Sequence, residues 1–277
     1  PLNLLGKNPK ADYIHTGIWS EKALKEAQRY GEINIVEAGT TLNGKLAIKD
    51  QSEWSLSQDA AYVHYADNET IGGLQFAGVP EVNAPLVSDL SSSILSAPID
   101  VSKFGLIYAG AQKNIGPAGL TIVIVRDDLL DQSRSEIPSI LKYSAQAKND
   151  SMVNTPATYS WYLSGLVFEW LLEQGGVEAI HQVNLEKAKL LYGYIDASDF
   201  YNNPIAEANR SIMNVPFTLA DEALEKLFLK EAEENHLLNL AGHRSVGGMR
   251  ASIYNAVPLE GVQALVNFMD DFARRNG

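Results

Sequence analysis

The chain has 277 residues, of which 45% are hydrophobic and 20% charged, so it is long enough for one or two globular domains with a sizeable core. Its 22 Lys and Arg residues against 34 Asp and Glu residues give a formal net charge of −12, which argues against a nucleic-acid or anionic-membrane partner. There is no cysteine, which excludes disulfides, thiolate metal sites and a cysteine nucleophile. Apolar runs such as 120–125 are too short to span a bilayer and no signal-like segment is visible, so we expect a cytoplasmic protein.

The first half of the chain alternates short apolar runs with helix-period segments, which predicts an α/β fold with a mainly parallel sheet. Pro1–Gly6 is typical of the last turn of a helix with its glycine cap, so we expect a further segment before it. Ser20 is expected to cap a helix that runs to Tyr30 and stops at Gly31. The predicted strands are 12–15, 33–37, 60–65, 85–87, 105–109 and 120–125, with a polar turn at 66–70.

In the second half, Thr155 as N-cap and Pro156 as first helical residue predict a long helix that ends at Gly175. This helix is apolar nearly all round, so we expect it in the core or in a subunit interface. The remaining predicted elements are a helix at 177–195, a strand at 212–217, an acidic helix at 221–235, a strand at 249–254 and a final helix. They indicate a smaller second domain, with domains at 1–180 and 181–277.

Lys113 lies among small residues between two predicted strands, in the segment Ala109–Gly119. A Walker-type phosphate loop needs four residues between its first glycine and the Gly-Lys pair. Here Gly110 and Gly116 enclose five residues and the lysine lies inside the loop, so that interpretation fails. A lysine that forms a Schiff base with a carbonyl cofactor and an ordinary loop lysine both remain open.

Asp89 ends an apolar strand, the position at which α/β folds place ligand contacts. Pyridoxal phosphate (PLP) needs a lysine for its aldehyde and an aspartate beside its ring nitrogen. Asp89 precedes Lys113 by 24 residues with one short strand between them, so adjacent strand ends could bring both to one site. A turn or helix-cap aspartate is the alternative.

Three segments carry a resemblance to a known family: Asp89–Ser93, Tyr108–Gly119 and His243–Arg250. Together they resemble the phosphoserine aminotransferases, class V aminotransferases with the type I PLP-dependent fold, over the whole chain. The resemblance implies a mainly parallel seven-stranded-type sheet flanked by helices, a smaller α+β C-terminal domain, PLP as cofactor and a homodimer with shared active sites. In that family a further N-terminal segment supplies an arginine to the cofactor phosphate and a His-Arg pair to the substrate.

The resemblance also implies roles for five residues around the cofactor. Lys113 would form the Schiff base and move the Cα proton of the substrate, and Asp89 would pair with the ring nitrogen. Trp19 would stack on the ring, although a core tryptophan is the simpler interpretation. Thr70 would lie near the phenolic oxygen, and Gln112 would bind the phosphate.

Further roles concern the dimer and the substrate. Asn154 and Thr155 would reach the phosphate of the partner subunit's cofactor, which agrees with an expected helix N-terminus there. Arg250 would bind the substrate carboxylate as a fork. His243 and Arg244 would meet the phosphate of phosphoserine, in their own site or across the interface. We expect no metal site, and we interpret four other histidines as structural: His15, His64, His181 and His236.

The expected function is transamination between O-phospho-L-serine with 2-oxoglutarate and 3-phosphohydroxypyruvate with glutamate, and the family also acts on a phosphorylated hydroxythreonine in pyridoxine biosynthesis. Another aminotransferase of small amino acids would have no reason to carry His243 and Arg244 beside Arg250. A cysteine desulfurase would need the cysteine that is absent. A catalytically incomplete fragment is the remaining alternative.

Overall fold

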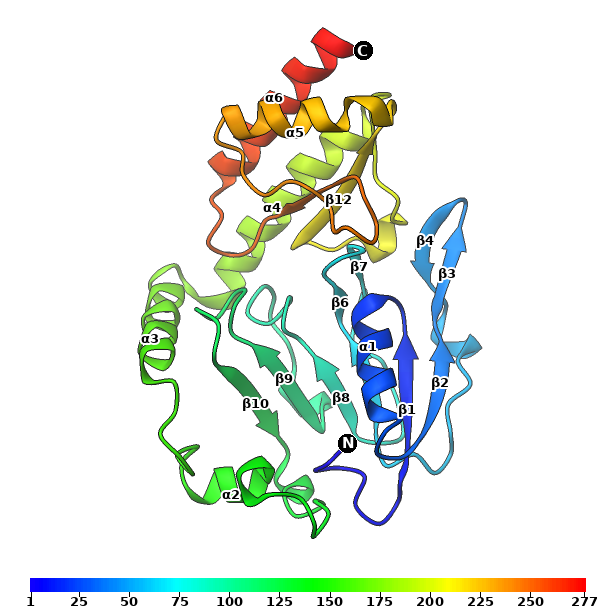
Figure 1. The fold of residues 1–277 in the computed structure, drawn as a ribbon, viewed down its shortest axis with the longest axis vertical. Helices are drawn as coiled ribbons and strands as arrows, with labels where there is room; N and C mark the ends of the chain where they lie inside the picture. The colour runs from blue at the N-terminus through cyan, green and yellow to red at the C-terminus, as the bar shows by residue number, and fades with distance from the viewer.

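A six-stranded sheet forms the lower part of the computed structural model, which describes residues 1–277, and a smaller unit lies above it (Figure 1). The strand order is β10-β9-β8-β5-β1-β2. Neighbouring strands run parallel except β10, which is antiparallel to β9. Their bounds are Lys10–His15 (β1), Glu32–Glu37 (β2), Val63–Ala66 (β5), Leu86–Asp89 (β8), Leu106–Gly110 (β9) and Thr121–Val125 (β10). The predicted mainly parallel α/β fold is confirmed, with six strands in this chain instead of seven.

The central strands are short apolar runs because both faces of the sheet are covered. All four residues of β5 are buried, as are Leu86, Val87 and Ser88 of β8. Helix α1 (Ile18–Ala27) packs on one face, where its Leu24 and Ala27 join a buried cluster with Tyr13 and Tyr62. A second buried hydrophobic cluster, separate from the first, includes Ile14, Val36, Leu90 and Ile107.

The predicted start of α1 is wrong, because Gly17 and not Ser20 occupies the N-cap position. Ser20 lies inside the first turn, and its hydroxyl accepts hydrogen bonds from the backbone N–H groups of Thr16 and Gly17, both at 2.9 Å. Two free N–H groups of the first turn, those of Trp19 and Ser20, are satisfied by Glu69, a residue about fifty positions away.

Two small hairpins flank the carboxyl ends of the sheet. The first is formed by β3 (Gly39–Leu42) and β4 (Lys45–Ile48), and the second by β6 (Asn68–Glu69) and β7 (Leu74–Gln75). The second hairpin begins inside the predicted polar turn at 66–70 and extends beyond it, and Ala66 belongs to β5. Short 3₁₀ helices connect other elements, at Gln51–Glu53, Val101–Lys103, Asp127–Leu129, Ser139–Leu141, Glu207–Asn209 and Glu222–Leu224.

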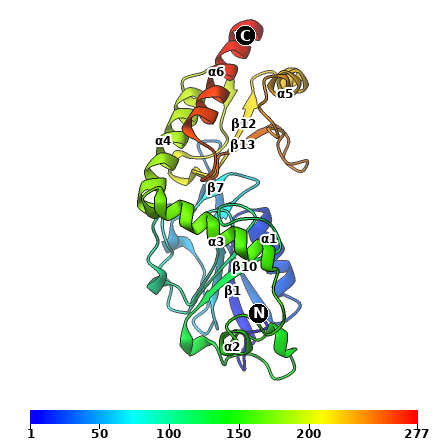
Figure 2. The ribbon, with the colours of Figure 1, turned by 90° about the vertical axis from the view of Figure 1, so that its left-hand side faces the viewer.

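The upper unit is a three-stranded antiparallel sheet covered by helices. Its strands are β11 (Tyr201–Asn202), β12 (Asn214–Leu219) and β13 (Met249–Ser252), and its helices are α4 (Gly176–Asp196), α5 (Glu225–Glu234) and α6 (Leu259–Asn276). A buried cluster of 20 residues fills it, with Phe228 and Phe272 packed edge to face at 5.1 Å. Helix α4 extends from the end of α3 into this unit (Figure 2). Residue 180, the predicted domain boundary, therefore lies within one continuous helix.

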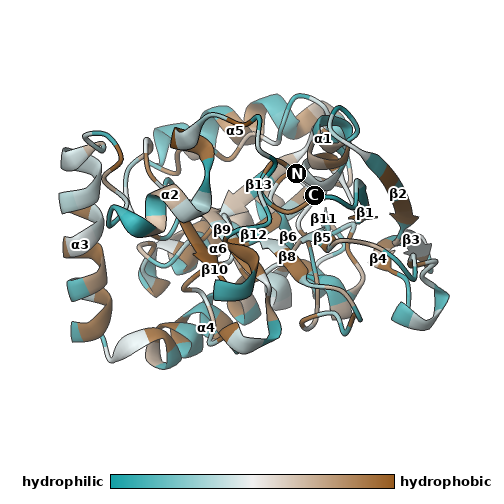
Figure 3. Ribbon diagram, turned by 90° about the horizontal axis from the view of Figure 1, so that it is seen from below, coloured by the Kyte–Doolittle hydropathy of each residue, from teal (hydrophilic) through white to brown (hydrophobic).

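Helix α3 (Thr158–Glu173) follows α2 (Tyr143–Lys148) and lies at the edge of the molecule, with hydrophobic residues beyond its first turn (Figure 3). Only Ser164 and Leu171 of α3 are buried, which excludes the expected core position in this chain. The predicted N-cap is also wrong. Ala157 occupies the N-cap position, and its carbonyl accepts the first helical hydrogen bond, from the backbone N–H of Trp161 at 3.0 Å. None of the helices has both the length and the apolar character needed to cross a bilayer.

Candidate active site

A cavity of about 120 Å³ lies where β5, β8 and β9 end, at the edge of the sheet that faces the upper unit. Parallel strands direct their carboxyl ends to one edge, so residues that follow separate strands meet there. Five predicted site residues line this cavity: Trp19, Thr70, Asp89, Gln112 and Lys113. Ala66, Asn68, Ser91 and Ser92 complete the lining.

Lys113 extends its amine into this cavity from the turn after β9. Its Nζ donates a hydrogen bond of 2.8 Å to Thr70 Oγ1 and lies 5.8 Å from the centre of the Trp19 ring. Burial lowers the pKa of the Lys113 amine and the charge of Arg250 lowers it further, whereas Asp89 opposes the shift. The free-base fraction of this amine is therefore larger than that of a solvated lysine.

The turn that carries Lys113 is held by its neighbours. The buried Asn114 donates to the carbonyl of Ile94 at 3.0 Å and accepts from the backbone N–H of Asn255 at 3.1 Å. Gly110 leaves room for the Gln112 side chain, since a Cβ at position 110 would lie 2.5 Å from Gln112 Oε1. The site thus depends on a fixed backbone and not on the lysine alone.

Asp89 is the last residue of β8, and Tyr108 is its register partner on β9. Asp89 Oδ1 accepts the backbone N–H of Ser91 at 2.8 Å. Burial raises the pKa of the Tyr108 hydroxyl well above its usual range, and the nearby charge of Asp89 raises it further. The same hydroxyl lies 2.9 Å from Nε2 of the buried His64. Burial also lowers the pKa of His64 to about 4, so this imidazole is neutral at pH 7.

Arg250 reaches the site from β13 of the upper unit. Its Nη1 donates to the backbone carbonyl of Thr70 at 3.3 Å. Its Nε is buried and has no hydrogen-bond partner. Arg250 is partly buried, and a guanidinium with an unused donor is suited to an incoming carboxylate.

Five of the ten predicted site residues lie outside the cavity lining: Arg250, which contacts Thr70 at its edge, and four others. His243 and Arg244 belong to a partly exposed loop, in which His243 Nδ1 lies 2.7 Å from Ser245 Oγ. Asn154 and Thr155 are exposed, and Asn154 Nδ2 donates to the Thr155 carbonyl at 3.2 Å. Because α3 begins at Thr158, the predicted helix N-terminus at Asn154 and Thr155 is wrong.

Three residues around the cavity escaped sequence reasoning. Asn114 follows Lys113 directly and could have been noticed for that reason. Asn68 donates to Ser92 Oγ and to Asn214 Oδ1, both at 2.9 Å, and so joins the sheet edge to the upper unit. Glu69 is only 1% exposed although it carries a carboxylate. No local pattern marks Asn68 or Glu69, because their partners lie far away in the sequence. No group of His, Asp and Glu side chains is arranged to hold a metal ion.

Comparison with known proteins gives a consistent result. The family described as aminotransferase class-V matches residues 2–265. The phosphoserine aminotransferase of Acinetobacter baylyi is 89% identical over all 277 residues, which cover 77% of its length. That of Pseudomonas putida is 63% identical and also covered to 77%.

Solved structures agree with this result. Phosphoserine aminotransferase from Bacillus circulans subsp. alkalophilus is 46% identical, with a TM-score of 0.95 over the whole chain and 77% of its own. The PLP-bound enzyme from Trichomonas vaginalis is 41% identical, with a TM-score of 0.91 over 98% of this chain and 77% of its own.

Proposed function

Because the chain belongs to the phosphoserine aminotransferases of the class-V aminotransferase family, we propose that the cavity around Lys113 is its active site. The reaction is PLP-dependent transamination between O-phospho-L-serine with 2-oxoglutarate and 3-phosphohydroxypyruvate with L-glutamate, a step of serine biosynthesis. The chain spans 77% of the length of its curated relatives. The observation that supports the site most strongly is the meeting of Lys113, Thr70, Asp89 and Trp19 in one cavity.

The chemistry of these side chains fits PLP. A carbonyl cofactor needs an amine that is partly unprotonated, and burial lowers the pKa of Lys113. A pyridine nitrogen that must stay protonated needs a carboxylate, which Asp89 supplies. Trp19 offers an aromatic face to the ring, Thr70 a hydroxyl and Gln112 an amide for the phosphate. These five residues would hold the cofactor.

PLP, when bound, withdraws electrons from the substrate Cα and makes its proton acidic. Lys113 supplies the only amine that lines the cavity, so it would take that proton from Cα and return it to the C4′ carbon of the cofactor. Its lowered pKa favours the free base that must accept the proton. Thr70 holds the Nζ atom at one side of the cavity through their hydrogen bond.

The substrate anions require local positive charge, since the chain as a whole carries −12. Arg250 would bind the carboxylate of each amino acid, through the edge that includes its unpartnered Nε. His243 and Arg244 would bind the phosphate of phosphoserine. They lie on the loop that leads into β13, the strand that carries Arg250.

We extend the proposal to a homodimer in which α3 is a contact surface between two copies. Its exposed apolar side chains include Tyr159, Tyr162, Leu166 and Leu172, and Leu172 is 74% exposed. The inner side of α3 contacts the segment that carries Lys113 (residues 109–119, the lysine turn), where Ser160 donates to the Ala118 carbonyl at 3.0 Å. Asn154 and Thr155 precede α3 and would reach the partner's cofactor. Sedimentation equilibrium tests the dimer. The wild-type chain is expected to be a dimer and the Leu172→Lys variant a monomer. A monomeric wild-type chain would contradict the dimer proposal.

The division into domains at 1–180 and 181–277 is also part of this proposal, and it is supported by the separate buried clusters of the two units. A cytoplasmic location, which the sequence led us to expect, is a further part of the proposal, and cell fractionation would test it.

Substrate discrimination tests the proposed phosphate contacts. The purified chain is expected to transfer the amino group of phosphoserine to 2-oxoglutarate and to leave serine nearly unreacted. Arg244→Ala is expected to raise the KM for phosphoserine about 10-fold, because a charged hydrogen bond contributes about 1.5–3 kcal/mol. Arg126→Ala removes an exposed arginine that pairs with Asp128 and is the matched control. Equal rates with both amino acids would favour another small-amino-acid aminotransferase, and no rate with saturating PLP would favour an incomplete fragment.

A further inference from the structure

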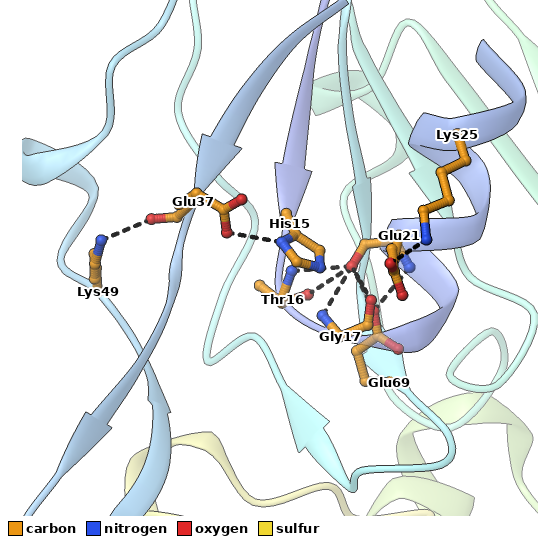
Figure 4. A network of polar contacts seen from close by, with 9 residues as sticks. His15, Thr16, Gly17, Glu21, Lys25, Glu37, Lys49 and Glu69 are labelled. Atoms are coloured by element: carbon orange, nitrogen blue, oxygen red, sulfur yellow. Dashed lines mark hydrogen bonds and ion pairs between the residues drawn. The ribbon is translucent and has the colours of Figure 1, made fainter. Parts of the chain in front are cut away.

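Glu69 places a buried carboxylate at the first turn of α1 (Figure 4). Its Oε2 accepts the backbone N–H of Trp19 at 2.8 Å. Its Oε1 accepts the backbone N–H of Ser20 at 2.8 Å and the Ser20 hydroxyl at 2.7 Å. A carboxylate that accepts helix N-terminal N–H groups is stabilised by the hydrogen bonds and by the helix dipole.

The chain around this carboxylate is fitted closely to it. Gly17 has no side chain, and a Cβ there would lie 2.7 Å from Glu69 Cδ. Real Cβ atoms essentially never approach that closely, so either the carboxylate or the chain would move. Ser20, which is 1% exposed, also receives the N–H groups of Thr16 and Gly17 and closes the turn around Glu69.

Glu69 is joined by the chain to Thr70, which has its own contacts in the cavity. Thr70 Oγ1 receives Lys113 Nζ at 2.8 Å, and its carbonyl receives Arg250 Nη1 at 3.3 Å. Two consecutive residues therefore join the helix that carries Trp19, the lysine turn and the upper unit. A shift of Glu69 would move Trp19 relative to Lys113.

We propose that Glu69 is a positioning residue for the reaction: it holds the N-terminus of α1 so that the Trp19 indole faces the cofactor beside Lys113. The carboxylate touches neither cofactor nor substrate and acts through Trp19. Its negative charge also favours the protonated form of Lys113, which is consistent with its place beside the cavity. This inference rests on the proposed placement of Trp19 against the cofactor ring.

The test compares Glu69→Gln with Glu37→Gln. A glutamine keeps the size but turns one acceptor into an amide donor that faces an N–H group. Glu37, whose side chain is 63% exposed and pairs with His15, is the matched control. Gly17→Ala is a second variant, which displaces the carboxylate without removing it.

The readout is the tryptophan fluorescence lost when PLP is added, taken as the difference between each protein and the same protein with Trp19→Phe. This difference isolates Trp19 from the other three tryptophans. We expect clear Trp19 quenching in the wild type and in Glu37→Gln. In Glu69→Gln and Gly17→Ala we expect at most half of that quenching and a Kd for PLP raised about 10-fold, with circular dichroism unchanged.

The outcomes separate the two proposals. Wild-type quenching that persists unchanged in Glu69→Gln and Gly17→Ala would overturn the role of Glu69 and leave the placement of Trp19 intact. No Trp19 quenching in the wild type would overturn the placement of Trp19 and the role of Glu69 with it. If Glu69→Gln loses its helical circular dichroism, Gly17→Ala alone decides between these results.

Discussion

The Lys113 amine donates a hydrogen bond of 2.8 Å to the Thr70 hydroxyl, although 43 residues separate the two in the sequence. Lys113 follows β9 and Thr70 follows β6, so the contact exists only because two separate turns meet at the sheet edge. The bond fixes the amine at one side of the cavity and compensates part of its desolvation.

Removal of the Thr70 hydroxyl should weaken cofactor binding. Thr70→Val keeps the shape but loses the hydroxyl that would contact the cofactor near its phenolic oxygen, and we expect the Kd for PLP to rise about 10-fold. Thr70→Ser keeps the hydroxyl and should stay within about 3-fold of the wild type. Titration of the visible absorbance of bound PLP measures both. Equal affinities for the Val and Ser variants would contradict the role of the hydroxyl.

Asp89→Asn should slow the reaction and change its pH dependence. The substituted side chain would keep the Oδ1 acceptor for Ser91 but lose the charge, and we expect kcat to fall about 100-fold. Because the Asp89 charge raises the pKa of Lys113, its loss should shift the acidic limb of the kcat profile, which reports the enzyme–substrate complex in which the lysine amine is free, to lower pH. Asp59→Asn removes an exposed charge that pairs with Lys10 and should change neither quantity. An unchanged acidic limb in Asp89→Asn would show that this charge does not act on the lysine.

His64 should make the fold sensitive to acid. Burial lowers the pKa of His64 from 6.5 to about 4 in the folded chain. Between these pH values the unfolded chain binds a proton that the folded chain does not, so the free energy of unfolding falls as the pH falls. The loss due to His64 is at most about 3 kcal/mol at pH 4.

Urea denaturation at pH 7, 5.5 and 4 measures this loss. His64→Gln can still bond to Tyr108 but cannot titrate, so it should lose less stability than the wild type over this range. His236→Asn removes an exposed histidine whose positive φ of 62° asparagine tolerates, and it should follow the wild type. The same acid loss in His64→Gln as in the wild type would contradict the prediction.

The sheet could be predicted from the sequence because its strands are short apolar runs bounded by turn residues. All six predicted strands exist, with ends that differ by a few residues. The antiparallel direction of β10 could not be predicted, since an apolar run carries no information about its direction. The start of α1 was missed because its N–H groups are satisfied by Glu69 and not by a neighbour in the sequence.

The residues of the candidate site likewise fall into those that a local sequence signal marks and those that only the fold brings to the site. Lys113 and Asp89 carry local signals, since one lies in a glycine-rich turn and the other at a strand end. Arg250 looked like any surface arginine, and only the packing of β13 above the sheet brings it to the Thr70 carbonyl. The roles of all the predicted site residues stay predictions, and four of them, His243, Arg244, Asn154 and Thr155, lie away from the cavity lining.

Reductive labelling of the lysine tests the central claim most directly. The chain is loaded with PLP, reduced with borohydride, digested and mapped by mass spectrometry, which fixes the cofactor to the amine that holds it. We predict that the pyridoxyl group is on the peptide that contains Lys113 and that Lys113→Ala yields no labelled peptide. A label on another lysine, such as the buried Lys187 or the exposed Lys25, with Lys113 unmodified would contradict the account.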